Sequence, residues 1–356
     1  MKKKKWLALA LTLTMSLGML TACGGGTQTS TGSTGAGNAS DTGSESSGTD
    51  PVVVQIGYEN TPGDHIDLGC NKWAELLEER SGGTMKMEVY PASQLGAKTE
   101  LIDQMLAGAP VITLSDGAFY ADRGVPDFGI VFGPYLFETW DEVWTFNDSD
   151  VYQEMVDKLA TDGGLKILAS NWIYGDRNIL SKKPITSLAD MKGLKIRVPS
   201  NNIQVMGMEV LGANPTPMAL GDVYTALQQG TIDAFEQPTA VIYAGKYYEA
   251  AKHLTITEHV KNNTTWICGT TFFDSLTPEQ QELLIETGEE AGIYCNEQYE
   301  IQTAEAVDAL KEAGVEVHEI DLEEFRQAAQ AFYELPEFTS VWSEGLYDRV
   351  QAAMGR

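Results

Sequence analysis

The sequence predicts an α/β fold of two lobes that are joined by hinge strands and by one long helix. Three observations support this prediction. Apolar strands alternate with amphipathic helices in the first part of the chain, which is typical of parallel sheets with crossover helices. A second unit of strands and helices follows between residues 178 and 235. Residues 277–311 then predict a helix of about 50 Å, which is longer than one small domain is wide, so it should span both lobes.

Local signals mark where the individual elements begin and end. Asp64 or Asp67 begins the first helix, and Thr277 with Pro278 forms the capped start of the long one. Gly230 ends a helix that begins at Asp222. The predicted strands are 52–58, 85–90, 111–114, 165–172, 178–181, 194–198, 232–235, 253–258 and 264–269. The other predicted helices are 98–107, 322–332 and 338–354, of which the last two are amphipathic and expected on the outside.

Each lobe is predicted to combine segments that lie far apart in the chain. The roughly 300 residues after the N-terminal region are enough for two domains. We assign residues 51–174 and 263–302 to the first lobe, and residues 175–262 and 303–356 to the second. Gly175 is the expected crossing between the lobes, because it closely follows a buried strand.

The N-terminal region has the pattern of an export signal followed by a linker. Residues 1–22 comprise a run of lysines, an apolar stretch of about 14 residues and a small-residue box that ends before Cys23. Because the apolar stretch is shorter than the ~20 residues that cross a bilayer, we favour a cleaved signal over a membrane anchor. Cys23 resembles the lipidated Cys of a bacterial lipobox, which predicts an extracytoplasmic protein that is lipid-anchored to the outer face of the cell membrane. Residues 23–50 are rich in Gly, Ser and Thr, so we predict a flexible linker.

The charge balance restricts the possible partners. The sequence holds 51 Asp and Glu against 24 Lys and Arg, which gives a formal net charge of −27 at pH 7. Such an excess of negative charge argues against nucleic acid as a partner and for solubility in an exposed setting. Net charge does not exclude an anionic ligand, because a few placed arginines can line a pocket, and the chain has only seven Arg residues.

The residue types that carry metal or catalytic chemistry show no matching pattern. The cysteines beyond Cys23 lack C-x-x-C spacing and are predicted to be buried free thiols, at Cys70, Cys268 and Cys295. The histidines are scattered and are predicted to form no metal site, at His65, His253, His259 and His318. The sequence contains no G-x-S-x-G, H-E-x-x-H, P-loop or G-x-G-x-x-G motif in a fitting context. We therefore predict that the protein is not an enzyme and uses no cofactor. A secreted carbohydrate enzyme is the alternative, but the sequence shows no convincing pair of acidic residues for it.

The strongest functional pattern lies in residues 191–238. It reads M-K-G-L-K-I-R-V-P and, further on, L-G-A-N-P-T-P-M-A-L-G-D-V-Y-T-A-L-Q-Q-G-T-I-D-A-F-E-Q-P. In the predicted strand 194–198, Arg197 points to the side opposite Ile196 and Val198. A guanidinium that is fixed on a strand offers a rigid fork of donors that matches a carboxylate. The pattern therefore predicts a site for an organic anion.

This segment resembles the signature of the solute-binding proteins of tripartite ATP-independent periplasmic (TRAP) transporters, the DctP family, without a gap. Residues 90–96 (Y-P-A-S-Q-L-G) and 133–137 (G-P-Y-L-F) resemble the same family. The resemblance implies a periplasmic-binding-protein-like fold that closes on a small organic acid by hinge motion. It also implies delivery of that acid to integral-membrane transporter subunits. There are two alternatives: the receptor of an ATP-driven importer, and a sensory module that presents its ligand to a membrane-bound kinase.

The resemblance also implies which residues bind the ligand. Arg197 takes the position of the main carboxylate clamp and Arg177 that of a second anion contact. Alternatively, each arginine pairs with a nearby Asp or Glu on the surface. Gln237 stands where many members have an Asn that hydrogen-bonds the carboxylate, and Leu220 where a Phe often packs against the ligand. Asp116 matches a cleft acid that accepts hydroxyl hydrogen bonds, although it could equally begin a turn.

An aromatic contact completes the predicted site. Trp172 could line the cleft, although an aromatic residue in such a strand could also belong to the core. The predicted ligand-binding residues are therefore Arg197, Arg177, Gln237, Asp116, Leu220 and Trp172. Leu220 leaves more room than Phe, Gln237 moves the amide by one methylene, and Asp116 in the cleft would accept hydroxyl hydrogen bonds. Together they favour a uronate or another acid sugar over a plain dicarboxylate.

Overall fold

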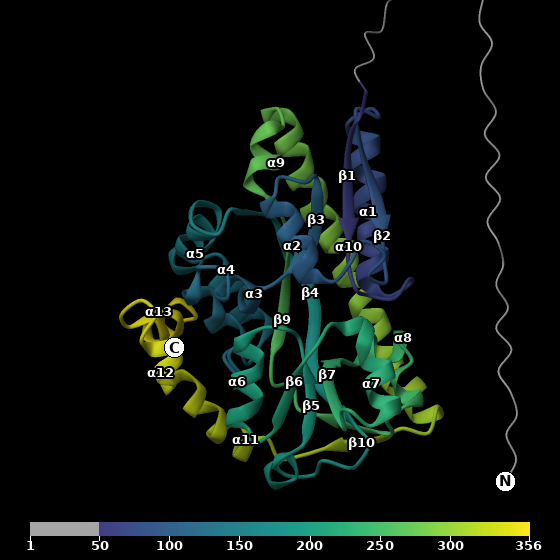
Figure 1. The fold of residues 1–356 in the computed structure, drawn as a ribbon, viewed down its shortest axis with the longest axis vertical. Helices are drawn as coiled ribbons and strands as arrows, with labels where there is room; N and C mark the ends of the chain where they lie inside the picture. The colour runs from purple at the N-terminus through teal and green to yellow at the C-terminus, as the bar shows by residue number, and fades with distance from the viewer. Residues whose placement is uncertain (1–49) are drawn as a thin grey trace, which may run out of the picture. The chain divides into compact units, whose positions relative to one another are not determined.

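The structure is a computed structural model, and it describes residues 50–356. These residues form a ten-stranded mixed sheet with helices around it (Figure 1). The predicted signal of residues 1–22, the lipidated Cys23 and the linker up to residue 49 lie outside the described residues and stay predictions. Among the described helices, none combines the length and the hydrophobicity that crossing a membrane requires.

The first lobe begins with parallel strands and crossover helices, as predicted. Its elements are β1 (Val52–Gly57), α1 (His65–Arg80), β2 (Met85–Tyr90), α2 (Lys98–Leu106) and β3 (Val111–Ser115). β1 lies between β2 and β3 and is parallel to both. Asp64 caps α1, since its carboxylate accepts a hydrogen bond from the backbone N–H of Asp67. The carboxyl ends of these strands therefore meet at one edge of the sheet, where a ligand cleft is expected.

Two antiparallel strands connect the lobes, namely β4 (Leu165–Ser181) and β9 (Lys261–Gly269). β4 pairs with β9 up to Asp176, and from Arg177 onward it pairs with strands of the second lobe. The predicted strands 165–172 and 178–181 are thus parts of one strand. Gly175 lies at this change of partners with φ +128°, and a Cβ there would come within 2.6 Å of Tyr299 and 2.8 Å of Pro238. Only glycine fits this close approach.

The second lobe is a further unit of strands and helices. Its elements are β5 (Lys195–Val198), α6 (Asn202–Val210), β6 (Asn214–Pro217), α7 (Val223–Gln229), β7 (Ala234–Pro238), α8 (Thr239–Ala244), β8 (His253–Ile256) and β10 (Glu316–Glu319). β5 lies between β6 and β7 in parallel pairing, while β8 joins β4 to β10. Gly230 ends α7 in the left-handed conformation, as predicted from the sequence.

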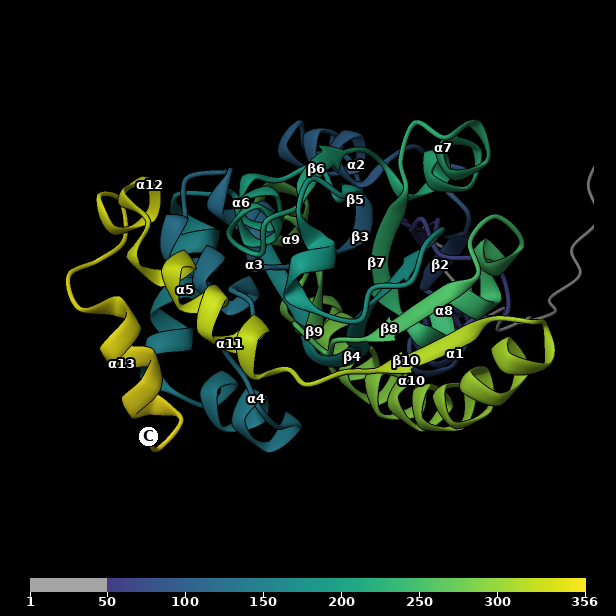
Figure 2. The same cartoon turned by 90° about the horizontal axis from the view of Figure 1, so that it is seen from below.

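The long helix α10 (Pro278–Glu312) confirms the expectation of a helix that spans both lobes. It contains 35 residues and begins with the predicted capping box, in which Thr277 and Gln280 satisfy each other's backbone groups. α10 packs on α1 in the first lobe, on β4, and on α8 in the second lobe. Both views show it passing beside elements of the two lobes in turn (Figures 1 and 2).

The core of the first lobe contains the three cysteines and Trp172. Cys70, Cys268 and Cys295 are buried free thiols within residues 50–356, as predicted. Trp172 is fully buried among Trp73 and Trp266, with ring centroids 5.1–6.1 Å apart. Its Nε1–H donates to the carbonyl oxygen of Gly288 in α10 at 2.9 Å. The indole is thus fully engaged by packing and hydrogen bonding inside the lobe.

The C-terminal region is more broken than its periodicity predicts. It contains α11 (Glu323–Ala329), α12 (Pro336–Thr339) and α13 (Leu346–Ala353). α12 ends at Thr339, and Gly345, at φ +67°, precedes α13, so the predicted helix 338–354 is interrupted. The sequence patterns missed several helices, namely α3 (Gly117–Ala121), α4 (Trp140–Asn147), α5 (Asp150–Thr161), α6, α8 and α9 (Thr270–Ser275). They also missed the strands β6 and β10.

The C-terminal helices lie at the side of the molecule opposite α7 and α8 (Figures 1 and 2). Phe332, Trp342 and Leu346 share one hydrophobic cluster with Phe128 and Val143, which belong to the predicted first lobe. The segment that we assigned to the second lobe therefore packs on the first as well. The predicted residue limits of the lobes stay a prediction.

Candidate ligand-binding cleft

Five of the six predicted site residues line one cleft between the lobes. They are Arg177, Arg197, Asp116, Leu220 and Gln237. The cleft encloses about 400 Å³ of space between atoms, including the part that opens to solvent. These side chains come from β4, β5, β7 and the segments after β3 and β6, so segments far apart in sequence form one polar surface. That they bind the ligand stays a prediction.

Arg197 presents a buried cation that is only partly satisfied. The residue is 1% exposed on β5, between the apolar neighbours that the sequence pattern indicated. Its Nε and Nη2 donate to the backbone carbonyl of Met218 at 2.9 and 2.7 Å. Its Nη1 has no hydrogen-bond partner among residues 50–356. Burial lowers the pKa of the guanidinium, and the negative charge of Glu59 acts in the opposite direction.

Arg177, in contrast, is neutralised by the protein itself. Its Nε and Nη2 donate to the two carboxylate oxygens of Glu236, the latter at 2.7 Å, and its Nη1 donates to Asn262 Oδ1 at 2.7 Å. Arg177 and Glu236 are 2% and 1% exposed. Burial opposes ionisation of Glu236, but the charge and hydrogen bonds of Arg177, with His259 Nε2 3.4 Å away, lower the pKa of its carboxyl group to about 2. Arg177 thus pairs with an acid, but with the buried Glu236 and not with a nearby acid on the surface, as the alternative had it. That Arg177 contacts the ligand stays a prediction.

Asp116 begins a turn and also lines the cleft. Its Oδ1 accepts a hydrogen bond from Ala118 N at 3.1 Å, so it caps the short helix α3. Its Oδ2 lies 3.6 Å from Lys98 Nζ, and both side chains line the cleft. One carboxylate can thus begin a turn and still offer acceptor capacity to the cleft.

Glu59 links the two lobes across the cleft and was not identified from the sequence. It follows β1 in the first lobe, and its Oε1 accepts a hydrogen bond from Leu220 N of the second lobe at 3.1 Å. Asp122 makes a second link, because its carboxylate accepts from the backbone and side-chain nitrogens of Asn202 at 3.1 and 3.0 Å. The lobes are therefore held together by contacts that are independent of a ligand.

The remaining predicted residues differ in their placement. Gln237 is 3% exposed in the cleft, and its Oε1 finds no hydrogen-bond partner in the described part of the chain. Leu220 is buried at the cleft wall. Trp172 does not join them, because its ring faces the core of the first lobe, where Trp73, Trp266 and α10 enclose it. Of the two alternatives for Trp172, the structure shows the core position.

A positional rule could have found several residues that the sequence analysis missed. Glu59 and Asn60 directly follow the carboxyl end of β1, where ligands of open α/β sheets commonly bind. Lys98 opens α2 and lines the same cleft. Asn262 and Tyr174 lie on the two connecting strands, and only their pairing across β4 and β9 brings them into the site.

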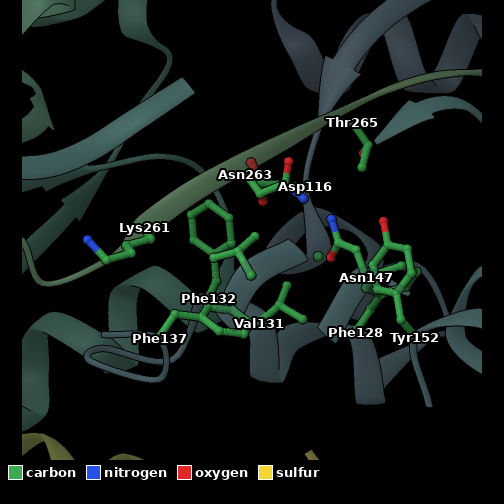
Figure 3. Close-up of a pocket in the computed structure, with 12 residues that line it drawn as sticks. Asp116, Phe128, Val131, Phe132, Phe137, Asn147, Tyr152, Lys261, Asn263 and Thr265 are labelled. Carbon is green, nitrogen blue, oxygen red and sulfur yellow. The ribbon is translucent and has the colours of Figure 1, made fainter. Parts of the chain in front are cut away.

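A second, mostly apolar cavity adjoins the cleft and shares Asp116 with it (Figure 3). Figure 3 shows Asp116 and Asn263 on the upper side of this cavity, with Phe132 and Val131 below them. The Asn263 Oδ1 atom is buried and has no hydrogen-bond partner within the described residues. Asp116 therefore lies where the polar cleft borders the second, mostly apolar cavity.

Two of the histidines that we expected to be scattered meet in the fold. His253 Nδ1 lies 3.2 Å from His318 Nε2, and Glu316 joins the pair. The expectation was wrong for these two residues, because it considered distance along the chain. The parallel pairing of β8 with β10 brings together positions that are 65 residues apart.

The fold and the cleft together define a two-lobed solute-binding protein. Two α/β lobes, joined by β4, β9 and α10, enclose a polar cleft that contains a buried and partly unsatisfied arginine. The model of the DctP family, described as bacterial extracellular solute-binding protein, family 7, matches residues 56–339. The chain belongs to this family, the solute-binding proteins of TRAP transporters.

Known relatives cover most of the chain. The 2,3-diketo-L-gulonate-binding periplasmic protein YiaO of Escherichia coli K12 is 33% identical over 266 residues, which are 74% of this chain and 80% of the relative. The structure of a TRAP periplasmic solute-binding protein from Ochrobacterium anthropi with bound L-fuconate is 37% identical, with a TM-score of 0.82, and covers 86% of this chain and 100% of its own. A similar protein from Actinobacillus succinogenes 130z with bound L-galactonate is also 37% identical, with a TM-score of 0.81, covering 85% of this chain and 99% of its own.

We expect that replacing Glu59 by Ala removes a link between the lobes and loosens the closed arrangement. The Leu220 N–H would lose its partner, and Arg197 would lose the acid that favours its charged form. Small-angle X-ray scattering of the unliganded variant should show a larger radius of gyration than the parent. Replacing the exposed Glu305 by Ala is the control and should change nothing. An unchanged radius for the Glu59 variant would contradict a role for this contact in closure.

Proposed function

We propose that this chain is the extracytoplasmic receptor of a TRAP transporter and captures an acid sugar for delivery to the membrane subunits. The observation that carries the proposal is Arg197, a buried guanidinium whose Nη1 has no partner within residues 50–356. A buried charged group with an unsatisfied donor is unfavourable, and a ligand carboxylate would complete its hydrogen bonds. Arg177 supports this division of roles, because Glu236 already neutralises it and leaves Arg197 as the cation that is free to bind an anion.

The rest of the cleft favours a polyhydroxylated monocarboxylate. Asp116, Glu59 and the unpartnered Gln237 Oε1 offer acceptors for ligand hydroxyl groups. Leu220 supplies an apolar wall without an aromatic stacking face. L-Fuconate and L-galactonate, the ligands bound by the two similar structures, are acids of this kind.

We infer that capture occurs by closure of the lobes about the connecting strands. Gly175, at the change of partners along β4, has the backbone freedom that a hinge position requires. The links of Glu59 to Leu220 and of Asp122 to Asn202 support a closed state that a ligand would favour further by contacting both lobes. In this proposal the protein performs no catalysis and needs no cofactor.

The proposed location follows from the N-terminal sequence. A cleaved signal and lipidation of Cys23 would anchor the body to the outer face of the cell membrane, and the linker would give it a reach of about 30 Å. Family membership favours TRAP subunits as the membrane partners over an ATP-driven importer or a sensory kinase. Neighbouring genes for one small and one large integral-membrane subunit, without an ATPase gene, would support that choice.

Calorimetric titration and thermal unfolding with a panel of acids would test the ligand class. The panel should contain L-fuconate, L-galactonate, D-glucuronate, succinate and pyruvate, with galactitol as the neutral match to galactonate. We expect at least one acid sugar to bind one per chain and to raise the melting temperature, because a ligand at 100 times Kd stabilises by about 2.7 kcal/mol.

Galactitol is expected to produce no shift, because it lacks the carboxylate that Arg197 would bind. Binding of succinate or pyruvate in preference to every acid sugar would keep the receptor function but reject the proposed ligand class. If no carboxylate in the panel binds, the proposed function loses its support.

A further inference from the structure

A second group of ligating side chains lies outside the cleft, on the paired strands β8 and β10. The register pairs His253 with Glu316 and Thr255 with His318. Side chains alternate between the two faces of a strand, and paired residues of parallel strands point to the same face. His253, Glu316 and His318 therefore project from one face of the sheet edge. None of them lines the ligand cleft.

Two of the distances among these three side chains are close to those of a metal site. His253 Nδ1 lies 3.2 Å from His318 Nε2 and 3.6 Å from the nearer Glu316 carboxylate oxygen. One ligand atom from each residue lies within 4.8 Å of the others. Zinc binds His nitrogen and carboxylate oxygen at about 2.0–2.2 Å, so neighbouring ligands of a tetrahedral site are about 3.3–3.5 Å apart. The atoms of His253 thus already stand at the spacing that a shared ion needs.

The surroundings allow an ion to enter and to remain bound. The Glu316 side chain is 72% exposed, whereas that of His253 is only 17% exposed, so the site is open on one side and supported on the other. The neighbouring cation Lys252 is directed elsewhere, because its Nζ donates to the carbonyl oxygen of Ala313 at 2.9 Å. A metal would therefore face two imidazoles and one carboxylate without a competing ammonium group at that position.

We propose that His253, His318 and Glu316 bind one divalent transition-metal ion, with Zn²⁺ as the ion that this ligand set suits. Two imidazoles and one carboxylate are a known three-ligand zinc set, which leaves a fourth position for water or an external group. The ion would connect the edge strand β10, which follows the long helix α10, to β8 in the interior of the second lobe. Zinc binding therefore stabilises the second lobe without occupying the cleft.

Titration with Zn²⁺ alone tests the site in the full chain, purified without a polyhistidine tag and freed of metal. We expect one Zn²⁺ per chain and a rise in melting temperature upon saturation. His253→Gln and His318→Gln should each weaken Zn²⁺ binding by at least about tenfold, and the double variant should abolish it. Glu316→Gln should weaken it as well. Bound Co²⁺ should show the visible absorption of a tetrahedral complex.

Glu319→Gln is the matched control, because it removes the same charge from the same strand but on the opposite face. It should bind Zn²⁺ like the parent. Unfolding of every variant in the presence of a chelator establishes that each one folds. Two results would overturn the proposal: Zn²⁺ binding by the double His variant as tight as by the parent, or no binding by the parent at about 100 µM Zn²⁺. Either result would leave a plain hydrogen bond between two imidazoles. Acid-sugar binding at the cleft is measured separately and does not depend on this result.

Discussion

Replacing Arg197 by Met is expected to weaken binding of the acid ligand by about two to four orders of magnitude. The variant would bury a ligand carboxylate without its guanidinium, and breaking a buried ion pair costs about 3–5 kcal/mol, at about 1.4 kcal/mol per decade of affinity. The unliganded protein should keep its stability or gain some, because Arg197 is buried and its Nη1 has no hydrogen-bond partner among residues 50–356. Calorimetric titration measures the affinity, and chemical unfolding of the unliganded protein measures the stability.

Two further variants make this result specific. Arg197→Lys keeps the positive charge but loses the fork of donors, so we expect an intermediate affinity. Arg349→Met removes an exposed arginine that pairs with Glu154 far from the cleft, and it should bind the ligand normally. An Arg197→Met variant that binds as tightly as the parent, or that unfolds, would show that this arginine is structural.

Replacing Glu236 by Gln is expected to lower the free energy of unfolding by about 3–5 kcal/mol at pH 7. The change leaves Arg177 buried without its counterion while keeping the shape of the side chain. Glu305→Gln, on an exposed part of α10, is the control for the loss of one negative charge. A double replacement of Arg177 and Glu236 by Met and Leu should recover most of the stability, since no unpaired charge would remain.

The same pair predicts how stability depends on pH. The pKa of Glu236 is lowered from 4.5 to about 2 in the folded protein, so folding favours its ionised form. Its contribution, roughly 3 kcal/mol, is therefore fully present above pH 4.5 and is lost as the pH falls toward 2. Urea unfolding between pH 2 and 7 should show this loss in the parent and not in the Gln variant. Equal pH dependence of both proteins would contradict the role of this pair.

Much of the fold was predictable because its signals are local. The capping box at Thr277 and the left-handed Gly230 fix helix boundaries through backbone hydrogen bonds that lie within a few residues, and both were confirmed. The C-terminal region was less predictable. The amphipathic pattern predicted from residue 338 to 354 continues through Gly345, but there the backbone turns, and aromatic side chains of this region reach the cluster around Phe128.

The candidate site was predictable only in part, for a related reason. Arg197 and Trp172 both lie in apolar strands, and their sequence surroundings give no indication of whether a neighbouring element covers them. Trp172 is enclosed by α10, whereas Arg197 faces a cleft. Glu59 could not be assigned from its own segment, because its partner, the Leu220 N–H, belongs to the other lobe.

The sequence by itself determined the class of protein: alternating strands and helices, a long capped helix, and a strand arginine within residues 191–238. Only the tertiary structure decided which charges are paired. It places Glu236 against Arg177 and leaves Arg197 Nη1 without a partner in the described chain. It likewise aligns His253 with Glu316 through strand register. The physical reason is that an ion pair or a ligand set depends on distances in space of a few ångströms, which the pairing of distant strands sets and local sequence does not.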